Sequence, residues 1–476
     1  MLVGRATAQA FTTVHSFTVT APFPGPYTNG EGANPTAGLV LSNNSLYGTA
    51  GSGGTSGNGT VFVVHTDGTG FKTLHSFSAT FGLRYQPVIN SDGANPNGAV
   101  SLLGNTLYGT TSQGGNGGNG TVFAINADGT GFTNLYSFTA IPSFLQTNSD
   151  GANPHSGLIL TSNTLYGTTS AGGTSGAGTV FKLNTDGTGF TILHSFTATS
   201  SNTNADGANP EAGLILRSNT LYGTARAGGT SGAGTVFKLK TDGTGFTILH
   251  GFAGYPNEGA HPYAGLILSS NTLYGTTHEG GSWDFGTVFA VNTDGAGFET
   301  LNGLFGGFTA IHPYAGLLLE GDTLYGTAYE GSSGEGVVFA MRTDGTGFNQ
   351  VYSFTLASAP NPPTNADGAH PYAGFLSSSC RLYGTTHDGG SSGYGTVFSL
   401  SFAPQLTIIP SAANIILTWP TNYAGFDYAG YTLQFTTNLI TSAVWATNSA
   451  APVLVNGENA ATNPISGTQQ FFRLSR

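Results

Sequence analysis

The chain has 476 residues, which is long enough for two domains. Only 7% of the residues are charged and the net charge is −11, so no basic patch is available for phosphates, which argues against nucleic-acid binding. Glycine is abundant, at 75 residues, but 12% of the residues are aromatic and occur in regular apolar segments, which argues against disorder. The sequence contains no run of about 18 apolar residues, so it predicts no membrane span.

The first ten residues differ from everything that follows. They read Met-Leu-Val-Gly-Arg-Ala-Thr-Ala-Gln-Ala and end in Ala8-Gln9-Ala10, a small-x-small cleavage pattern. We interpret residues 1–10 as the remainder of a secretory leader whose apolar segment is missing. The alternative is an alanine-rich leader without a targeting role. The leader and the Thr/Ser/Asn/Gly-rich composition predict an extracellular or cell-surface protein.

A short phrase, Leu-Tyr-Gly-Thr, recurs seven times along residues 11–402. Its tyrosines are Tyr47, Tyr108, Tyr166, Tyr222, Tyr274, Tyr325 and Tyr383. Successive copies are separated by 61, 58, 56, 52, 51 and 58 residues. A period of this size with strand-like content predicts a β-propeller or another closed array.

One repeat, residues 207–252, shows how each unit is built. Four apolar runs, at 212–216, 220–224, 235–239 and 246–252, are rich in β-branched and aromatic residues and are bounded by Gly, Asn or Asp. Such runs predict strands, and the Ser-Asn and Asp-Gly pairs between them predict tight turns. Four strands joined in this way make one propeller blade.

The ends of the array predict how the ring closes. The strand pattern Phe11–Phe17 precedes the first Leu-Tyr-Gly-Thr, whereas the last unit ends at Thr396–Leu400 with no such strand after it. If Phe11–Phe17 completes the last unit, both irregularities disappear and no sheet edge is left free. An open solenoid should instead show atypical capping repeats, and none is evident. We therefore predict an all-β fold with a seven-bladed β-propeller over residues 11–402.

The composition changes near Ala403-Pro404, where the repeat stops. Short apolar runs then follow at 406–409, 414–419, 431–435, 443–445 and 470–474. They predict a small β-sandwich over residues 405–476, similar to immunoglobulin or fibronectin type III modules, with Trp419 in its core. The lone Cys380 cannot form an internal disulfide, and we expect it to be a small buried residue near a strand turn.

The combined repeat motif, Gly-Ala-Asn-Pro…Gly-Leu-Ile-Leu…Leu-Tyr-Gly-Thr…Gly-Thr-Val-Phe…Asp-Gly-Thr-Gly-Phe, resembles the GloVer tandem repeat of bacterial "choice-of-anchor" surface proteins. The segment Gln469–Leu474 resembles the end of modules that close many secreted proteins in bacteria carrying this repeat. The resemblance implies export and surface association. It implies no activity and no catalytic residues.

The repeats are not equal in the positions that flank the inner strands. The first four enter with Asn-Pro, and the last three enter with His-Pro-Tyr. The same three also carry an aromatic residue and an acid after Leu-Tyr-Gly-Thr, where the earlier copies mostly have Gly, Ser or Ala, with Arg226 as the exception. The candidate ligand-binding residues are His261, Tyr263, His312, Tyr314, His370, Tyr372, His278, Glu279, Tyr329, Glu330, His387 and Asp388.

In a propeller these positions lie near the central channel, where imidazoles, phenols and carboxylates can bind a sugar or a metal. We assign no metal and no catalytic residue to the chain. The alternative is a recent duplication of neighbouring repeats, in which the His and Tyr side chains only pack and bond to the backbone.

Three other patterns have structural explanations. Loops such as Asn90-Ser91-Asp92-Gly93 resemble pieces of a calcium site but lack the full twelve-residue pattern, and Asx turns explain them. The Gly-rich runs, such as 172–178, are not phosphate loops, because they lie between strands and lack a following Lys. His75, His194 and His250 recur with the repeat, and we interpret them as structural hydrogen-bonding partners.

Two classes of function remain. The first is a non-enzymatic surface or secreted protein that presents a propeller face to a glycan or a protein. The second is a carbohydrate-active lyase or hydrolase that uses the His, Tyr and acid residues of the last three repeats. It requires a base or nucleophile with a tuned pKa in a cleft, and a glycosidase also requires two carboxyl groups at catalytic separation. We expect a monomer without a cofactor.

Overall fold

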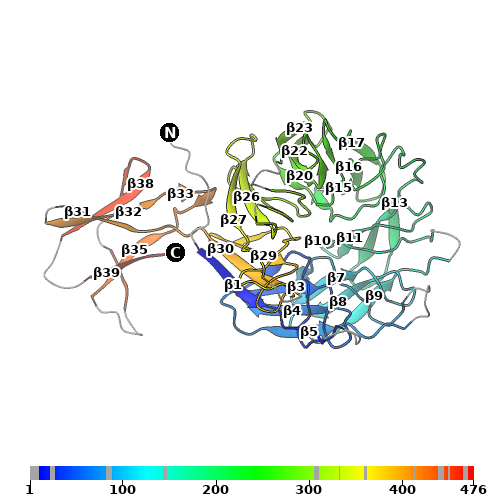
Figure 1. The fold of residues 1–476 in the computed structure, drawn as a ribbon, viewed down its shortest axis with the longest axis horizontal. Helices are drawn as coiled ribbons and strands as arrows, with labels where there is room; N and C mark the ends of the chain where they lie inside the picture. Colours follow the sequence, from blue (N-terminus) through cyan, green and yellow to red (C-terminus); the bar gives the residue numbers. More distant parts are fainter. Residues whose placement is uncertain are drawn as a thin grey trace.

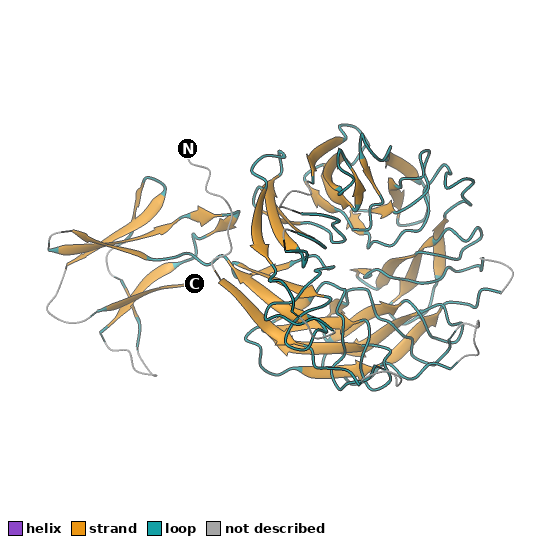
Figure 2. Ribbon diagram, in the orientation of Figure 1, coloured by secondary structure: helices purple, strands orange, loops and turns teal. Residues whose placement is uncertain are grey.

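The structure is a computed structural model that describes residues 10–21, 27–81, 88–142, 147–304, 310–331, 333–358, 362–411, 413–437, 444–448, 451–464 and 470–476. Residues 1–9 of the predicted leader lie outside the described residues, and Ala10 already belongs to the first strand. Every regular element in the described ranges is a β-strand (Figure 2). No helix in these ranges is long and apolar enough to cross a membrane.

Seven antiparallel sheets of four strands make up the described part of the repeat region, in a propeller-like arrangement (Figure 1). We number the sheets one to seven in the order of their Leu-Tyr-Gly-Thr phrases. Their innermost strands are β2 (Val40–Ser42), β6 (Ser101–Leu103), β10 (Ile159–Thr161), β14 (Ile215–Arg217), β19 (Ile267–Ser269), β24 (Leu318–Glu320) and β28 (Leu376–Ser378). The second strands, which carry the phrase, are β3 (Ser45–Ala50), β7 (Thr106–Thr111), β11 (Thr164–Thr169), β15 (Thr220–Ala225), β20 (Thr272–Thr277), β25 (Thr323–Ala328) and β29 (Arg381–Thr386).

The outer half of each sheet follows the same scheme. The third strands are β4 (Thr60–His65), β8 (Thr121–Asn126), β12 (Thr179–Asn184), β16 (Thr235–Lys240), β22 (Thr287–Asn292), β26 (Val337–Arg342) and β30 (Thr396–Ser401). The outermost strands are β5 (Lys72–Ser76), β9 (Thr133–Ser137), β13 (Thr191–Ser195), β17 (Thr247–Gly251), β23 (Glu299–Gly303), β27 (Asn349–Ser353) and, in sheet seven, β1 (Ala10–Ser16). A two-residue ladder joins β18 (Gly259–Ala260) to β21 (Glu279–Gly280).

Sheet seven takes its outermost strand from the start of the chain, as the sequence predicted. Strand β1 pairs with β30, with Phe11 opposite Leu400 and Ser16 opposite Thr396. Phe11 stacks on the ring of Tyr352 at 4.4 Å, and Phe17 is fully buried. The pairing therefore closes the array with both hydrogen bonds and apolar contact.

The Leu-Tyr-Gly-Thr phrase has a structural role in each of its residues. In sheet four, Leu221 is fully buried, and a Cβ on Gly223 would lie 2.7 Å from the ring of Phe237, so only glycine fits there. The hydroxyl of Thr224 is buried and donates to the backbone carbonyl of Ala264 in sheet five at 3.0 Å. The phrase thus packs its own sheet and bonds it to the next one.

This hydrogen bond is repeated around the whole ring. The donors and acceptors are Thr49 to Gly98, Thr110 to Ser156, Thr168 to Ala212, Thr224 to Ala264, Thr276 to Ala315, Thr327 to Ala373 and Thr385 to Ala37. The last bond joins sheet seven to sheet one. Seven equivalent side chains therefore hold seven sheets in one closed circle.

A second contact between sheets lies on the outermost strands. The His75 ring stacks on Phe132 of the next sheet at 3.8 Å, and its Nε2 lies 3.0 Å from a carboxylate oxygen of Asp92. His194 makes the same contacts with Phe246 and Asp206, and His250 stacks on Phe298. The structural role predicted for these histidines is confirmed by these contacts.

The C-terminal residues form two further sheets beside the ring (Figure 1). One contains β31 (Thr407–Ser411), β32 (Asn414–Pro420), β38 (Glu458–Pro464) and β37 (Val453–Val455), and the other contains β36 (Ala446–Thr447), β35 (Thr432–Thr436) and β39 (Phe471–Ser475). A hairpin of β33 (Asn422–Tyr423) and β34 (Phe426–Asp427) follows β32 in the chain and packs against the ring. Trp419 is 1% exposed and packs with Leu417 and Leu433, so its predicted core position is confirmed.

Some predicted boundaries are wrong. No strand is present at Val444-Trp445, where the sequence predicted one beginning at Ala443, which lies outside the described residues. Val444 is 85% exposed, because the strand that does form, β36, starts two residues later. The innermost strand of sheet four covers Ile215–Arg217 rather than 212–216, because the carbonyl of Ala212 accepts the hydroxyl of Thr168 instead of a ladder bond.

The C-terminal sheets and the ring share a hydrophobic core. Tyr325 donates its hydroxyl to the carbonyl of Ala424 at 2.5 Å, and Phe402 stacks on Phe426 at 4.9 Å. Tyr325 is fully buried, whereas the other Leu-Tyr-Gly-Thr tyrosines are 5–9% exposed. Cys380 belongs to the same core and lies in the turn before β29, as predicted.

The threonine hydrogen bonds between the sheets predict that removing a single hydroxyl lowers the stability of the fold. Thr224→Val keeps the side-chain shape but leaves the buried carbonyl of Ala264 without its partner, which should lower the free energy of unfolding by about 1–3 kcal/mol. Urea unfolding measures the change. Thr220→Val, in the same strand, serves as the control and should change stability by less than about 0.5 kcal/mol. Equal stability of the two variants would contradict the role of the ring.

Closure by β1 predicts a larger effect. Deleting residues 1–17 exposes the edge of β30 and removes Val14 and Phe17 from the core, which should cost about 4 kcal/mol or more. Differential scanning calorimetry should show a clearly lower melting temperature. Deleting residues 1–9 alone leaves β1 intact and should melt like the full chain. A 1–17 deletion that melts like the full chain would show that closure does not depend on β1.

Candidate functional site

The three histidines of the His-Pro-Tyr entries share a special backbone conformation. His261, His312 and His370 have φ angles of 54°, 57° and 54°, in the left-handed region. Asn34 and Asn209 hold the same conformation, with φ of 56° and 55°. Asn and His tolerate this region better than most residues. The exchange of Asn for His therefore keeps the backbone and changes only the side-chain chemistry.

In the first four sheets the asparagine side chain bridges to the preceding sheet. The Nδ2 of Asn95 donates to the carbonyl of Gly51 at 2.9 Å, and that of Asn209 donates to the carbonyl of Ser170 at 2.8 Å. Histidine replaces this bridge with other contacts. The Nδ1 atoms of His261 and His370 each lie 2.9 Å from a carboxylate oxygen, that of Glu279 and that of Asp388.

Eight aromatic side chains from sheets five to seven form a continuous set of ring contacts, which we call the tyrosine–histidine belt. Its members are Tyr263, His278, His312, Tyr314, Tyr329, His370, Tyr372 and His387. The centroid of Tyr314 lies 5.1 Å from that of Tyr263 and 4.7 Å from that of Tyr372. The belt therefore passes without interruption from one sheet to the next.

The structure brings together eleven of the twelve predicted residues by direct contact. His278 stacks on His312 at 4.7 Å, and Tyr329 stacks on His370 at 4.3 Å. Glu330 has its backbone bonded to Ile311 but makes no side-chain contact with the belt among the described residues. Its charge still acts on Tyr329 and raises the pKa of that phenol, after the larger effect of burial.

A cavity of about 360 Å³ lies at the centre of the ring. Each sheet contributes the residue that follows the entry proline. These seven mouth residues are Thr36, Asn97, His155, Glu211, Tyr263, Tyr314 and Tyr372. The cavity thus has a polar side from sheets one to four and an aromatic side from sheets five to seven.

Sequence reasoning found the aromatic side and missed the polar one. Tyr263, Tyr314 and Tyr372 line the cavity, whereas the predicted histidines do not. Two of these histidines, His278 and His387, contact the lining tyrosines. His155 and Glu211 were missed because each occurs once, so no pattern singled them out. Their place directly after Pro154 and Pro210, equivalent to Tyr263 after Pro262, is the signal that finds them.

The repeat pattern is also found by comparison with known families. Residues 5–200, 84–255, 138–301 and 221–413 each match the Gloeobacter/Verrucomicrobia repeat. The chain belongs to this repeat family. No curated protein matches the sequence.

Solved structures are similar to this Gloeobacter/Verrucomicrobia repeat protein only at a coarse level. The GH74 enzyme of Niastella koreensis has 13% identity and a TM-score of 0.49, over 94% of this chain and 72% of that one. An oligogalacturonate lyase in complex with manganese has 9% identity and a TM-score of 0.48, over 84% and 98%. PorZ, a surface component of the type-IX secretion system of Porphyromonas gingivalis, has 12% identity and a TM-score of 0.47, over 95% and 60%. Scores at this level support no argument about activity.

Arg226 links the two sides of the cavity in this repeat protein. Its Nε lies 2.9 Å from Oε1 of Glu211, its Nη1 donates to the Tyr263 hydroxyl at 3.1 Å, and its guanidinium lies 5.2 Å from the Tyr263 ring centroid. Burial raises the pKa of Glu211, and the charge of Arg226 opposes this shift. Burial also lowers the pKa of His155, so its imidazole is neutral at pH 7.

Two histidines of the belt have pKa values that are shifted in opposite directions. Burial and the nearby charge of His312 lower the pKa of His278 to about 4. Burial also disfavours the charged form of His370, but its hydrogen bond to Asp388 prevails and raises the pKa of His370. Asp388 is held well below its usual pKa, against the effect of burial, by hydrogen bonds from His370 and His387.

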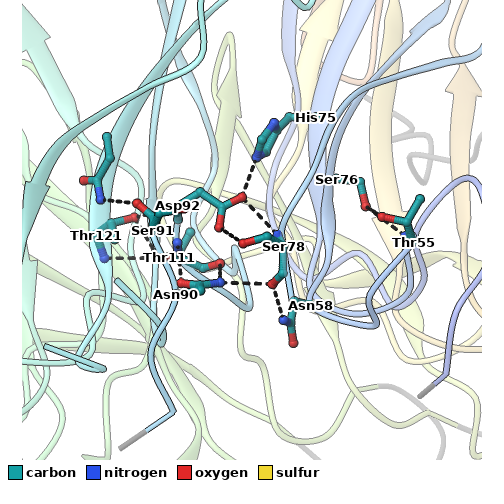
Figure 3. Close-up of polar contacts among 12 residues, drawn as sticks. Thr55, Asn58, His75, Ser76, Ser78, Asn90, Ser91, Asp92, Thr111 and Thr121 are labelled. Atoms are coloured by element: carbon teal, nitrogen blue, oxygen red, sulfur yellow. Dashed lines mark hydrogen bonds and ion pairs between the residues drawn. The ribbon is translucent and has the colours of Figure 1, made fainter. Parts of the chain in front are cut away.

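No group of three or more His, Cys, Asp or Glu side chains in the described ranges is placed to hold a metal ion. The calcium-like loops have their oxygens occupied by the protein (Figure 3). Asp92 Oδ2 accepts from the backbone of Ser78 at 2.9 Å and contacts His75 Nε2, while Asn90 Oδ1 accepts from Gly93 and Gly115. These loops therefore brace the sheets as Asx turns, and a cation would have to break those bonds.

The His370–Asp388 pair predicts a pH dependence. The raised pKa of His370 contributes stability that is complete below about pH 6.5 and is lost as the pH rises through the raised value. The lowered pKa of Asp388 contributes stability that is present above about pH 4 and is lost as the pH falls. Asp388→Asn should lower the His370 pKa, measured by NMR titration of its imidazole. The difference in free energy of unfolding between the Asp388→Asn variant and the unchanged protein should be largest between about pH 4 and pH 6.5, at up to about 1 kcal/mol.

His370→Asn identifies the His370 resonance in that titration. An unchanged His370 pKa in the Asp388→Asn variant would contradict the pairing.

Proposed function

We propose that the chain is an exported bacterial surface or secreted protein that binds a glycan or a protein ligand without transforming it. In this proposal residues 11–402 form a seven-bladed β-propeller, and residues 405–476 form an accessory β-sandwich. The observation that carries the proposal is the two-sided cavity mouth, in which phenols face hydroxyl, amide, imidazole and carboxylate groups at equivalent positions. Concave sites of mixed apolar and polar lining are typical of small-molecule binding.

Three further observations support binding. The ring supplies a rigid scaffold, since each mouth residue directly precedes a carbonyl that accepts a threonine hydroxyl from the preceding sheet. The carboxylates of Glu279 and Asp388 and the imidazoles of His261 and His387 are partly exposed, so a larger ligand can reach them. Resemblance to the choice-of-anchor surface proteins implies an extracellular setting.

A carbohydrate-active enzyme is the second candidate. Burial raises the pKa of Glu211, which suits a general acid. However, a glycosidase uses two carboxyl groups, and Glu211 is the only acid among the described residues that line the cavity. Binding without turnover is therefore the better supported function. A reducing-sugar assay on every glycan that binds separates the two, because only an enzyme releases new ends.

The three histidines of the His-Pro-Tyr entries provide the test of the site. The triple variant His261→Asn, His312→Asn, His370→Asn restores the residue of the other repeats at the same φ, so the fold should be kept. A glycan array and a panel of extracellular matrix proteins should show at least tenfold weaker binding by the variant. Circular dichroism and the melting temperature report on the fold.

Asn95→His is the matched control, since it places a histidine at the equivalent position of sheet two, away from the belt. It should bind like the unchanged protein. If the triple variant binds every identified ligand unchanged, the histidines are a trace of repeat duplication and the belt is not the site.

A further inference from the structure

We propose that the central cavity holds one uncharged pyranose residue of a glycan, stacked on the tyrosines and hydrogen-bonded to the opposite side. The inference rests on the proposed function and names the class of ligand for it. It is carried by three features of the cavity: an aromatic wall, an imidazole without a partner, and the absence of an unpaired charge among the described lining residues.

The aromatic wall consists of Tyr263, Tyr314 and Tyr372. Their ring centroids follow one another at 5.1 and 4.7 Å, with interplanar angles of 60° and 42°, so the three rings contact one another along this wall and present inclined faces and edges. Burial raises the pKa values of Tyr314 and Tyr372, which keeps these phenols uncharged. Aromatic rings offer a large apolar face with a polar tip, which suits a ligand that has both C–H faces and hydroxyl groups.

The opposite wall contains His155, whose imidazole has no hydrogen bond or ion pair within the described residues. A neutral imidazole has one donor and one acceptor nitrogen. A ligand hydroxyl that reaches this partly buried imidazole can donate to one ring nitrogen and accept from the other. A vicinal pair of hydroxyls, as on a pyranose ring, can accept from one polar group and donate to the next one.

Charge argues against ionic ligands. Glu211 is the only acid among the described lining residues, and Arg226 pairs with it at 2.9 Å. Arg226 also occupies the cation–π position near Tyr263, where a ligand cation would otherwise bind. A ligand carboxylate would meet Glu211 without a free cation to offset it. An uncharged ligand avoids both penalties.

The size of the cavity limits the ligand to one ring. A volume of about 360 Å³ is near the lower end of small-molecule sites, which span about 300–1,000 Å³. Apart from the mouth residues, the lining is mostly Ala and Gly, with Ser156, Leu158 and Leu214, and a Cβ on Gly316 would lie 3.1 Å from the carbonyl of Gly265. The sheets therefore approach one another closely at the centre of the ring.

The test uses the full chain and small probes of defined charge. The probes are the neutral methyl glycosides of glucose, galactose, mannose and N-acetylglucosamine, together with glucuronic acid and glucosamine. Calorimetry and NMR of the histidine side chains should show at least one neutral glycoside binding with a Kd of about 1–10 mM and shifting the His155 resonance. The charged probes should bind at least tenfold more weakly.

Two variants place the probe in the cavity. His155→Asn and Tyr314→Asn each introduce the residue that sheet two carries at the equivalent position, Asn97, and each should weaken the neutral glycoside at least tenfold. His65→Asn, at the end of strand β4 in sheet one, is the control and should bind unchanged. The two substitutions lie on opposite walls of the cavity. If one variant fails to fold, the other still tests whether the glycoside binds in the cavity.

The outcomes separate this inference from the proposed function. It is overturned if no neutral glycoside binds, if both folded variants bind it unchanged, or if glucosamine or glucuronic acid binds best. Array binding that is lost in the triple histidine variant but kept in both cavity variants overturns the cavity assignment alone. Binding of neutral glycosides that is lost in the cavity variants supports it, whatever the triple variant does.

Discussion

A buried threonine hydroxyl, donated from each sheet to the backbone of the next, is the interaction on which the rest of the structure depends. The acceptor carbonyl always belongs to the residue that follows the cavity-mouth residue, as Ala264 follows Tyr263 and Ala212 follows Glu211. The same bond that closes the ring therefore fixes where each mouth side chain starts. Because seven such bonds form a circle, no sheet can move without straining its neighbours, and the cavity is preorganised by the fold.

This arrangement separates the residues that fold the chain from those that vary. The mouth position carries Thr, Asn, His, Glu or Tyr in different sheets, yet its backbone is held in the same way throughout. Large changes in side-chain chemistry thus have little effect on the ring. Propeller-like scaffolds can therefore acquire a site by changing one residue per sheet, and function is decided by the site rather than by the fold.

The sequence predicted the repeat strands and the closure because both depend on local, repeated patterns. Four apolar runs per unit specify four strands, and the displaced Phe11–Phe17 strand reveals the partner of β30. It did not predict the three-residue strand β37, and it did not predict β38, whose residues, such as Asn459 and Thr462, lack the apolar alternation of a typical strand. Nor did it predict that the C-terminal hairpin covers Tyr325, because packing between distant segments leaves no local pattern. The same limit explains why Glu211 and His155 were missed while the repeated histidines were found.

Duplication of a repeat accounts for three identical His-Pro-Tyr entries, but it does not account for the residues that differ and still join the same contacts. Tyr329 stands where the neighbouring sheets have His278 and His387, and it stacks on His370 as His278 stacks on His312. Glu211 and Arg226, found in sheet four alone, extend the network to Tyr263 from the other side. Unlike residues that converge on one surface require a cause other than copying. A surface that must match a ligand is such a cause, because binding selects the combined chemistry of neighbouring sheets rather than the identity of each repeat.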